Sequence, residues 1–316
     1  MQFRIDGVLG RLLLLGAFAA LAACIGDEDN GALSGVEIAP PLVVPPSDNV
    51  NIPNPTLTLL ENAPVGSGDA LTLVWQDEFD GERIDPETWF FQSGDGTDEG
   101  IPGWGNNELQ YYLPDNAQVS DGLLRITARE ESVGAFRYTS ARIITRDRVA
   151  VQYGRIEARM RLPGGRGLWP AFWMLPQDNR YGGWAASGEI DIMEAVNLGA
   201  AGGNQVFGTL HYGGEAPANV FTGESYVVPA DATAEFHTYA IEWDPTEIRW
   251  YVDDVLYAMQ NSWFSTAADF PAPFDQPFYI LFNVAVGGNF PGAPNASTVF
   301  PVTMEVDWVR VYAGES

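Results

Sequence analysis

The sequence predicts an all-β protein, a β-sandwich or jelly roll built from two antiparallel sheets. Three observations lead to this fold class. Short segments in which apolar and polar residues alternate recur from about residue 71 onward, turn-forming segments rich in Gly, Pro, Asn and Asp separate them, and few stretches have the spacing of an amphipathic helix. The chain shows no internal repeat and no second folded domain.

The expected strands follow one another with little helix between them. They are residues 71–75, 123–127, 141–145, 154–161, 206–211, 238–243, 247–252, 278–284 and 304–312. Residues 84–89 can form one helical turn, because Asp85 can cap it and Pro86 suits its first position.

The composition allows a large core and argues against one class of partner. Of the 316 residues, 46% are hydrophobic and 12% are aromatic, which is enough to fill a sizeable core. The formal charge of −26 argues against nucleic acid and other polyanions, because like charges repel. All sixteen basic residues are Arg.

The N-terminus has the pattern of an export signal. Arg4 and Arg11 precede an apolar run that is too short to span a membrane comfortably and that ends in small residues. The four residues Leu-Ala-Ala-Cys at 21–24 are similar to the site at which bacterial lipoproteins are cleaved and lipidated, and Cys24 is the only cysteine. An ordinary secretory signal is the alternative.

We therefore expect three regions. They are a lipoprotein signal peptide at residues 1–23, a flexible Pro- and Asn-rich tether at residues 24–68, and a single folded domain at residues 69–316. Lipidation of Cys24 would anchor the exported protein in a membrane, at the cell surface or outer membrane, and without lipidation the protein would be secreted. We expect a monomer.

Residues 188–196, Gly-Glu-Ile-Asp-Ile-Met-Glu-Ala-Val, hold three acids in one strand-like segment. Glu189 and Asp191 share one face of a strand, whereas strict alternation turns Glu194 to the other face. A β-bulge at residues 192–193 would return Glu194 to the side of its partners. No Lys or Arg lies within the segment to neutralise the acids. Such a cluster suits glycoside hydrolysis, which needs two carboxyl groups in different protonation states.

Eight blocks in one order resemble glycoside hydrolase family 16. Besides the acidic segment they are residues 75–81, 104–111, 138–142, 167–175, 208–211, 236–243 and 282–288. Within the family they are most similar to laminarinase-like β-1,3-glucanases, whereas lichenases have an acidic strand shorter by one residue, without an equivalent of Met193. The resemblance implies a concave substrate cleft and a retaining endo-hydrolase of β-1,3 bonds in β-glucans such as laminarin. It implies no cofactor for the chemistry.

The resemblance makes Glu189 the nucleophile and Glu194 the general acid and base, with Asp191 orienting Glu189. With a bulge absorbing one residue, the two Glu Cα atoms lie about four strand steps of ~3.3 Å apart. Side chains that lean inward then bring the carboxyl groups to roughly 5–6 Å, a separation that suits retention of configuration. Crowded negative charge is expected to raise the pKa of Glu194.

Nine further residues of the matching blocks are candidates for substrate binding. Trp169 and Trp173 would share one face of a strand, where they line the cleft or pack in the core. Trp104 and Trp184 lie on Gly-rich loops, where an exposed ring favours binding. The other candidates are His211, expected beside the acidic strand, and Asn106, Glu108, Arg142 and Asn283, which can hydrogen-bond sugar hydroxyls or, for Arg142, pair with a structural carboxylate.

The resemblance also implies a structural Ca²⁺ on the convex side of the domain. Its ligands would be Glu78, the backbone carbonyl of Gly122, and Asp307. Carboxylate and carbonyl oxygens are hard ligands that suit Ca²⁺. Ordinary surface charge is the alternative for both acids.

Two other functions stay open. Agarases, porphyranases and carrageenases share the acidic strand, so another β-linked galactan, or the mixed-linkage glucan of a lichenase, is an alternative substrate. The second is a non-catalytic surface glycan-binding protein. Three mutually repelling acids argue against it, because binding alone does not need them.

Overall fold

The computed structural model describes residues 55–66, 68–200 and 203–315. By its contacts the chain divides into Met1–Pro40 and Pro41–Ser316, and every described residue belongs to the second unit. The predicted signal peptide, the lipidation site Cys24 and the tether up to residue 54 lie outside the described residues.

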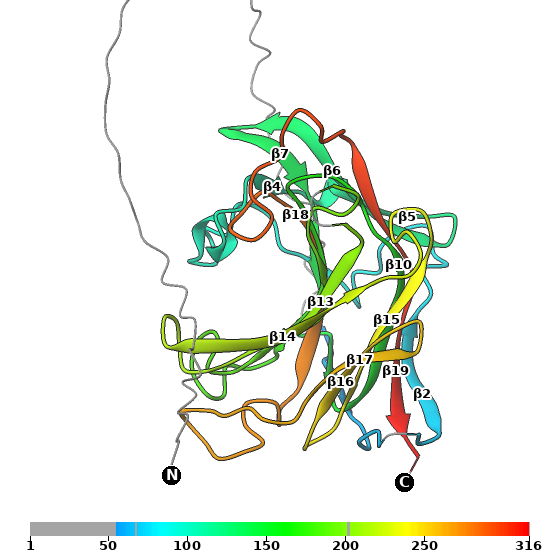
Figure 1. The fold of residues 1–316 in the computed structure, drawn as a ribbon, viewed down its shortest axis with the longest axis vertical. Helices are drawn as coiled ribbons and strands as arrows, with labels where there is room; N and C mark the ends of the chain where they lie inside the picture. Colours follow the sequence, from blue (N-terminus) through cyan, green and yellow to red (C-terminus); the bar gives the residue numbers. More distant parts are fainter. Residues whose placement is uncertain (1–54, 67, 201–202, 316) are drawn as a thin grey trace, which may run out of the picture. The chain divides into compact units, whose positions relative to one another are not determined.

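Two sheets form the described domain, and Figure 1 shows β13 and β14 on one side of it and β15, β16, β17 and β19 on the other. The order of the nine-stranded sheet is β1 (Thr58–Glu61), β9 (Val149–Gln152), β18 (Phe278–Val286), β11 (Leu168–Pro176), β12 (Glu189–Ala195), β13 (Gln205–Gly213) and β14 (Asn219–Val227), with β8 (Arg142–Ile144) paired to β18 and β3 (Phe90–Phe91) to β8.

The ten-stranded sheet packs against the first. Its order is β17 (Val255–Gln260), β16 (Ile248–Val252), β15 (His237–Trp243), β10 (Gly154–Arg161), β19 (Val302–Gly314), β6 (Leu123–Val133), β7 (Phe136–Ser140) and β4 (Gln110–Tyr112), with β2 (Leu71–Asp77) on β19 and β5 (Ala117–Ser120) on β6. Two short 3-10 helices, η1 (Pro102–Gly105) and η2 (Pro114–Asn116), interrupt the described strands. No helix among the described residues has the length and apolarity to cross a membrane.

The core lies between the two sheets, where strands such as β6 and β13 bury alternate residues. Phe172 of β11 stacks on Phe282 of β18 with ring centroids 4.8 Å apart. Trp250 of β16 is fully buried and reaches across the core to the acidic strand β12. The opposite sheet therefore contacts the acidic strand through a hydrogen bond from the Trp250 indole.

The all-β fold and the expected strands are confirmed, and three details differ from the prediction. The sheets are mixed, because β1 pairs in parallel with β9 and β4 in parallel with β7. Strand β1 lies inside the predicted tether, and Val65 just beyond it is buried, so the tether ends earlier than residue 68. The Pro- and Asn-rich composition around residues 51–55 masked this short strand. Residues 86–88 form the expected turn, in which Trp89 N–H donates to the Asp85 carbonyl.

Candidate active site

The bulge predicted in the acidic strand is present. On the β13 side Asp191 pairs with Thr209 and Glu194 with Phe207, so three steps along β12 match two steps along β13. Ile192 and Met193 are both buried in the core together with Ile190. The extra residue thus sends two successive apolar side chains inward and leaves Glu189 and Glu194 partly exposed on the opposite, outer face.

Each of the two glutamates accepts a hydrogen bond from a tryptophan. Trp184 Nε1 donates to Glu189 Oε2 at 2.7 Å, from a loop that precedes β12. Trp169 Nε1 donates to Glu194 Oε1 at 2.9 Å, from the neighbouring strand β11. The two bonds fix the carboxyl groups on the outer face of the nine-stranded sheet.

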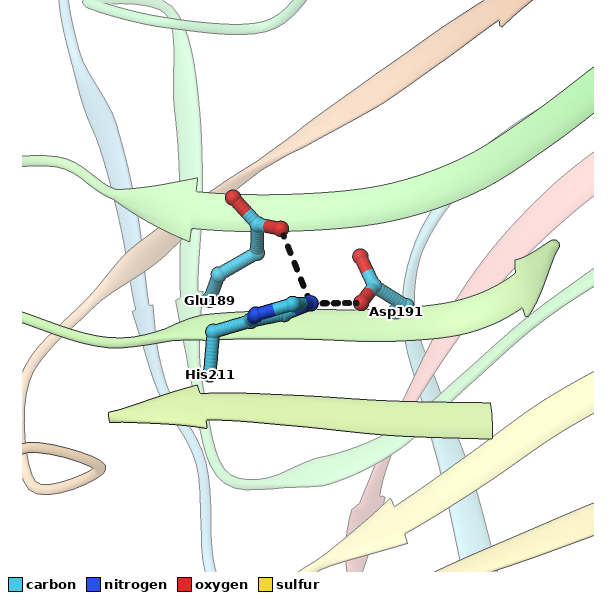
Figure 2. Close-up of side chains that lie close together, drawn as sticks. All are labelled: Glu189, Asp191 and His211. Atoms are coloured by element: carbon cyan, nitrogen blue, oxygen red, sulfur yellow. Dashed lines mark ion pairs between the residues drawn. The ribbon is translucent and has the colours of Figure 1, made fainter. Parts of the chain in front are cut away.

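His211 of β13 lies opposite Glu189 in the sheet. Its Nε2 is 3.6 Å from Glu189 Oε1 and 3.3 Å from Asp191 Oδ2, and Figure 2 shows this nitrogen facing both carboxyl groups. The expectation that His211 lies beside the acidic strand is therefore confirmed. The imidazole is placed to balance the charge of two acids at once.

Burial and neighbouring charge raise the pKa of both glutamates. Burial raises the pKa of Glu194 well above its usual range, and the charges of Asp191 and Glu189 raise it further, as the sequence predicts. Burial and then the charge of Asp191 raise the pKa of Glu189 to about 7, while His211 and the Trp184 N–H oppose the rise. Burial and nearby negative charge therefore favour the protonated form of Glu194, which is the form that a general acid needs.

The same group of side chains is the one set of described residues arranged as a metal site. Ligand atoms of Glu189, Asp191 and His211 all lie within 4.8 Å of one another. Burial lowers the pKa of His211, but the charges of Glu189 and Asp191 outweigh burial and raise this pKa to about 9. A protonated imidazole donates and has no lone pair for a metal, so the donor set fits an ion pair better than a cation.

A buried hydrogen-bond network centres on Glu108 and lies beside β18, which is two strands from the acidic strand. Its Oε2 accepts from Gln110 Nε2 at 2.6 Å and from the Tyr112 hydroxyl at 3.1 Å. Asn106 Nδ2 lies 3.4 Å from the other oxygen. Burial raises the pKa of Glu108 even though Arg142 and these donors oppose the rise. Gln110 Oε1 accepts a hydrogen bond from the backbone N–H of Val286, which joins the network to β18, all of whose residues are buried.

Asn283 joins this network to the tryptophans. Trp173 Nε1 donates to Asn283 Oδ1 at 2.7 Å, and Asn283 Nδ2 donates to the Tyr112 hydroxyl at 3.1 Å. The Arg142 guanidinium lies 4.5 Å from the ring of Trp104 and 4.8 Å from that of Trp173. Its Nε donates to Gln92 Oε1 at 2.6 Å. Arg142 thus stacks on tryptophan rings, and no described carboxylate forms an ion pair with it.

The candidate binding residues divide by exposure. Trp184 is exposed, and four others are partly exposed, namely Asn106, Trp169, Trp173 and His211. Glu108, Arg142 and Asn283 are buried. The expected exposed ring is wrong for Trp104, which is only 4% exposed. Its indole donates to the Gly94 carbonyl and its ring packs on Tyr112, so this loop folds inward onto a core residue.

Sequence reasoning missed several residues around the acids. Gln92, Gln110 and Tyr112 hold the buried network. Gln110 lies within a matching block and Tyr112 directly follows it, whereas nothing in the sequence marks Gln92. Phe290 packs edge-on against Trp169, and Phe221 lies beside His211, both with exposed rings. Phe290 lies two residues after the Gly-Gly end of a matching block, whereas nothing in the sequence marks Phe221.

The predicted calcium ligands flank β19. Glu78 follows β2, Gly122 precedes β6, and both of those strands pair with β19, which holds Asp307. Glu78 accepts two bonds from Arg310, at 2.7 and 2.9 Å, and Asp307 pairs with Arg159 at 2.5 Å. The oxygen donors suit Ca²⁺, but both carboxylates already bind guanidinium groups. The calcium site therefore stays a prediction.

Comparisons with known proteins agree with this geometry. The model of the glycosyl hydrolases family 16 matches residues 106–310. A β-glucanase of Rhodothermus marinus is 46% identical over 76% of this chain and 84% of its own length. A glucan endo-1,3-β-glucosidase A1 of Niallia circulans is 43% identical over 84% of this chain, which spans only 42% of that relative.

Solved structures give the same result. The laminarinase catalytic domain of Thermotoga petrophila has a TM-score of 0.71 and 41% identity, and the match covers 78% of this chain and 100% of that one. The laminarinase of Rhodothermus marinus has a TM-score of 0.68 and 43% identity over 79% of this chain and 100% of that one. The bulged acidic strand, its two tryptophan donors and these matches together establish that the chain belongs to glycosyl hydrolase family 16.

Proposed function

We propose that this chain is a retaining endo-glycoside hydrolase that cleaves β-1,3 bonds in β-glucans such as laminarin and needs no cofactor for the chemistry. The single observation that carries the proposal is the bulged strand β12, which holds Glu189 and Glu194 on one face, each bound by a tryptophan N–H. The assignment of a β-1,3-glucan as the substrate is supported by relatives described as glucan endo-1,3-β-glucosidases and laminarinases.

The reaction is a double displacement. The Glu189 carboxylate attacks the anomeric carbon while Glu194 gives its proton to the departing glycosidic oxygen, which breaks the bond and leaves a covalent glycosyl-enzyme. Glu194, now a carboxylate, takes a proton from water, and the resulting hydroxide displaces Glu189 from the sugar. Two inversions leave the product with the original β configuration.

Neighbouring groups divide the two roles. His211 and a tryptophan N–H lower the pKa of each glutamate, but Asp191 and Glu189 both raise the pKa of Glu194, whereas Asp191 alone of the other two acids raises that of Glu189. Among the described residues no hydrogen bond joins Asp191 to Glu189, so the expected orienting role of Asp191 acts through His211, whose Nε2 lies 3.3 Å from Asp191 Oδ2 and 3.6 Å from Glu189 Oε1. The expected separation of roughly 5–6 Å between the two carboxyl groups remains a prediction.

Two variants of the nucleophile test this mechanism. Glu189→Ala is expected to abolish release of reducing sugar from laminarin while its circular dichroism stays that of the wild type. Glu189→Gly with added azide is expected to yield an α-glycosyl azide, because azide enters from the face that Glu189 leaves open. Hydrolysis by a pure Glu189→Ala preparation would overturn the assignment.

Substrate breadth is the main alternative. Relatives include a keratan-sulfate endo-1,4-β-galactosidase, 33% identical, and an endo-1,3-1,4-β-glycanase, 30% identical. Comparing reducing-sugar release from laminarin, a mixed-linkage glucan and agarose separates these activities. One relative, 42% identical over 48% of this chain, is a β-1,3-glucan-binding protein, so binding without hydrolysis of any of the three would favour the non-catalytic alternative.

We also propose that the protein is an exported lipoprotein, anchored through Cys24 at the cell surface or outer membrane, with a monomeric catalytic domain. The Leu-Ala-Ala-Cys sequence at residues 21–24 and the lone cysteine support the anchor. Cys24→Ala is expected to move the protein from the membrane fraction to the soluble fraction. An unchanged distribution would exclude lipidation as the anchor.

A further inference from the structure

Two rows of aromatic side chains extend from the acids toward the sheet edge at β14. In the first row the centroid of the His211 ring lies 5.6 Å from the centroid of the Trp184 ring and 5.7 Å from that of the Phe221 ring. Phe221 is opposite His211 in the pairing of β13 with β14. The row therefore starts at the indole that holds Glu189 and ends on the outermost strand of this sheet.

The second row starts at the indole that holds Glu194. Phe290 packs edge-on against Trp169 at 5.5 Å and against Phe207 of β13 at 5.3 Å. Phe207 pairs with Glu194 across the sheet. Each row thus begins at a tryptophan that donates a hydrogen bond to one of the two glutamates.

Small residues lie between the two rows. Asp191 pairs with Thr209 on β13, and Thr209 pairs with Gly223 on β14, so one cross-strand line runs from the middle acid to the sheet edge. Gly223 has no side chain, and an added Cβ there would lie 2.8 Å from the Gly208 carbonyl oxygen and from Thr209 Oγ1. The side chains along this cross-strand line therefore protrude less from the sheet than the aromatic rings on either side of it.

Phe221 is the aromatic residue at the far end, and 69% of it is exposed. We infer that Phe221 is a stacking platform for a sugar ring of the same glucan chain that is bound at the acids. This inference rests on the proposed function and adds a binding position to it. Strand β14 is two strand spacings from β12, about 9–10 Å, a span comparable to two linked pyranose rings.

The chemistry of the line suits a neutral, polyhydroxylated chain. A pyranose ring has an apolar face for the Phe221 ring and hydroxyl groups at its edge for the Thr209 hydroxyl. An exposed aromatic ring continuous with the site is a recurrent mark of ligand binding, whereas an isolated exposed ring is not. Phe264 provides the contrast, because it is 50% exposed but its ring packs on Tyr212, which belongs to neither row.

The experiment compares Phe221→Ala with the matched control Phe264→Ala. The measured quantity is the ratio of kcat/KM on laminarihexaose to kcat/KM on laminaritriose. Loss of a stacked ring is expected to lower this ratio roughly two- to tenfold in Phe221→Ala, and Phe221→Tyr is expected to restore it. Phe264→Ala is expected to keep the wild-type ratio.

A binding measurement separates this inference from the proposed function. In a Glu189→Gln background, calorimetry with laminarihexaose is expected to show weaker binding when Phe221 is replaced by Ala. Equal long-to-short ratios in Phe221→Ala and Phe264→Ala, or equal affinities in the inactive background, would overturn the platform. Failure of the wild type to hydrolyse laminarin would instead overturn the proposed function, while the calorimetry still tests Phe221.

Discussion

Replacing Trp250 by Phe tests how the opposite sheet holds the acidic strand. Trp250 is fully buried, and its Nε1 donates to the backbone carbonyl of Asp191 at 2.8 Å, beside the bulge. Phe keeps an aromatic ring but removes the N–H. Depriving a buried acceptor of its donor costs about 1–3 kcal/mol of unfolding free energy. The smaller ring leaves a gap that adds to this loss.

The matched control is Trp243→Phe. Trp243 is also fully buried, and its Nε1 donates to the Phe274 carbonyl at 3.2 Å, with no contact to the acidic strand among its hydrogen bonds. Urea unfolding is expected to give similar stability losses for the two variants. Trp250→Phe is also expected to lower kcat, by roughly 10²-fold at most, because a shift near 1 Å in the Asp191 backbone misplaces both glutamates. Trp243→Phe is expected to keep the kcat of the wild type.

Kinetics on laminarin under conditions where both variants remain folded provide the assay. A drop in kcat for Trp250→Phe alone supports the role of Trp250 in positioning the bulge. If the two variants keep equal kcat values at equal stability, the bulge holds its geometry without the indole and the reasoning is refuted.

Three further predictions concern charge, packing and metal. His211→Gln removes a positive charge that holds down the pKa of Glu189, so this pKa is expected to move above about 7. The acid limb of the pH profile of kcat/KM is then expected to move to higher pH, and an unmoved limb would contradict the pairing of His211 with Glu189. Gly208→Ala places a Cβ 2.7 Å from Trp250 Nε1, so the urea midpoint should fall by the equivalent of about 1–3 kcal/mol, and an unchanged midpoint would show that the indole can move freely. Arg310→Gln frees a predicted calcium ligand, so added Ca²⁺ should raise the Tm of this variant more than that of the wild type; a Tm that responds to neither Ca²⁺ nor EDTA would exclude the site.

Local alternation along the chain predicted the strands and, through Met193, the bulge. Burial of Ile192 and Met193 side by side is what the spacing of the acids required, because an unbulged strand would turn Glu194 into the core. Burial is the largest cause of the raised pKa of Glu194, and the sequence predicted only the smaller part that comes from the acids on the same strand. These features depend on residues close together in the chain.

The features that the sequence missed depend on residues far apart in the chain. Asn283 and Tyr112 are hydrogen-bonded across 171 positions, and a single sequence does not reveal that they meet. Trp104 resembles an exposed loop residue until Arg142 and Tyr112 are seen to cover it. Strand β1 was missed because its pairing with β9 joins residues about 91 positions apart, within a segment that is otherwise typical of a linker.

The tryptophan that holds Glu189 also gives the protein an optical signal. Of the ten Trp residues, all within the described part of the chain, Trp184 alone has an exposed side chain, at 46%. A soluble quencher such as acrylamide should therefore reach this indole before the other nine. A sugar that covers the indole would shield it from the quencher, so intrinsic fluorescence can follow occupancy beside Glu189 without a label or a chromogenic substrate.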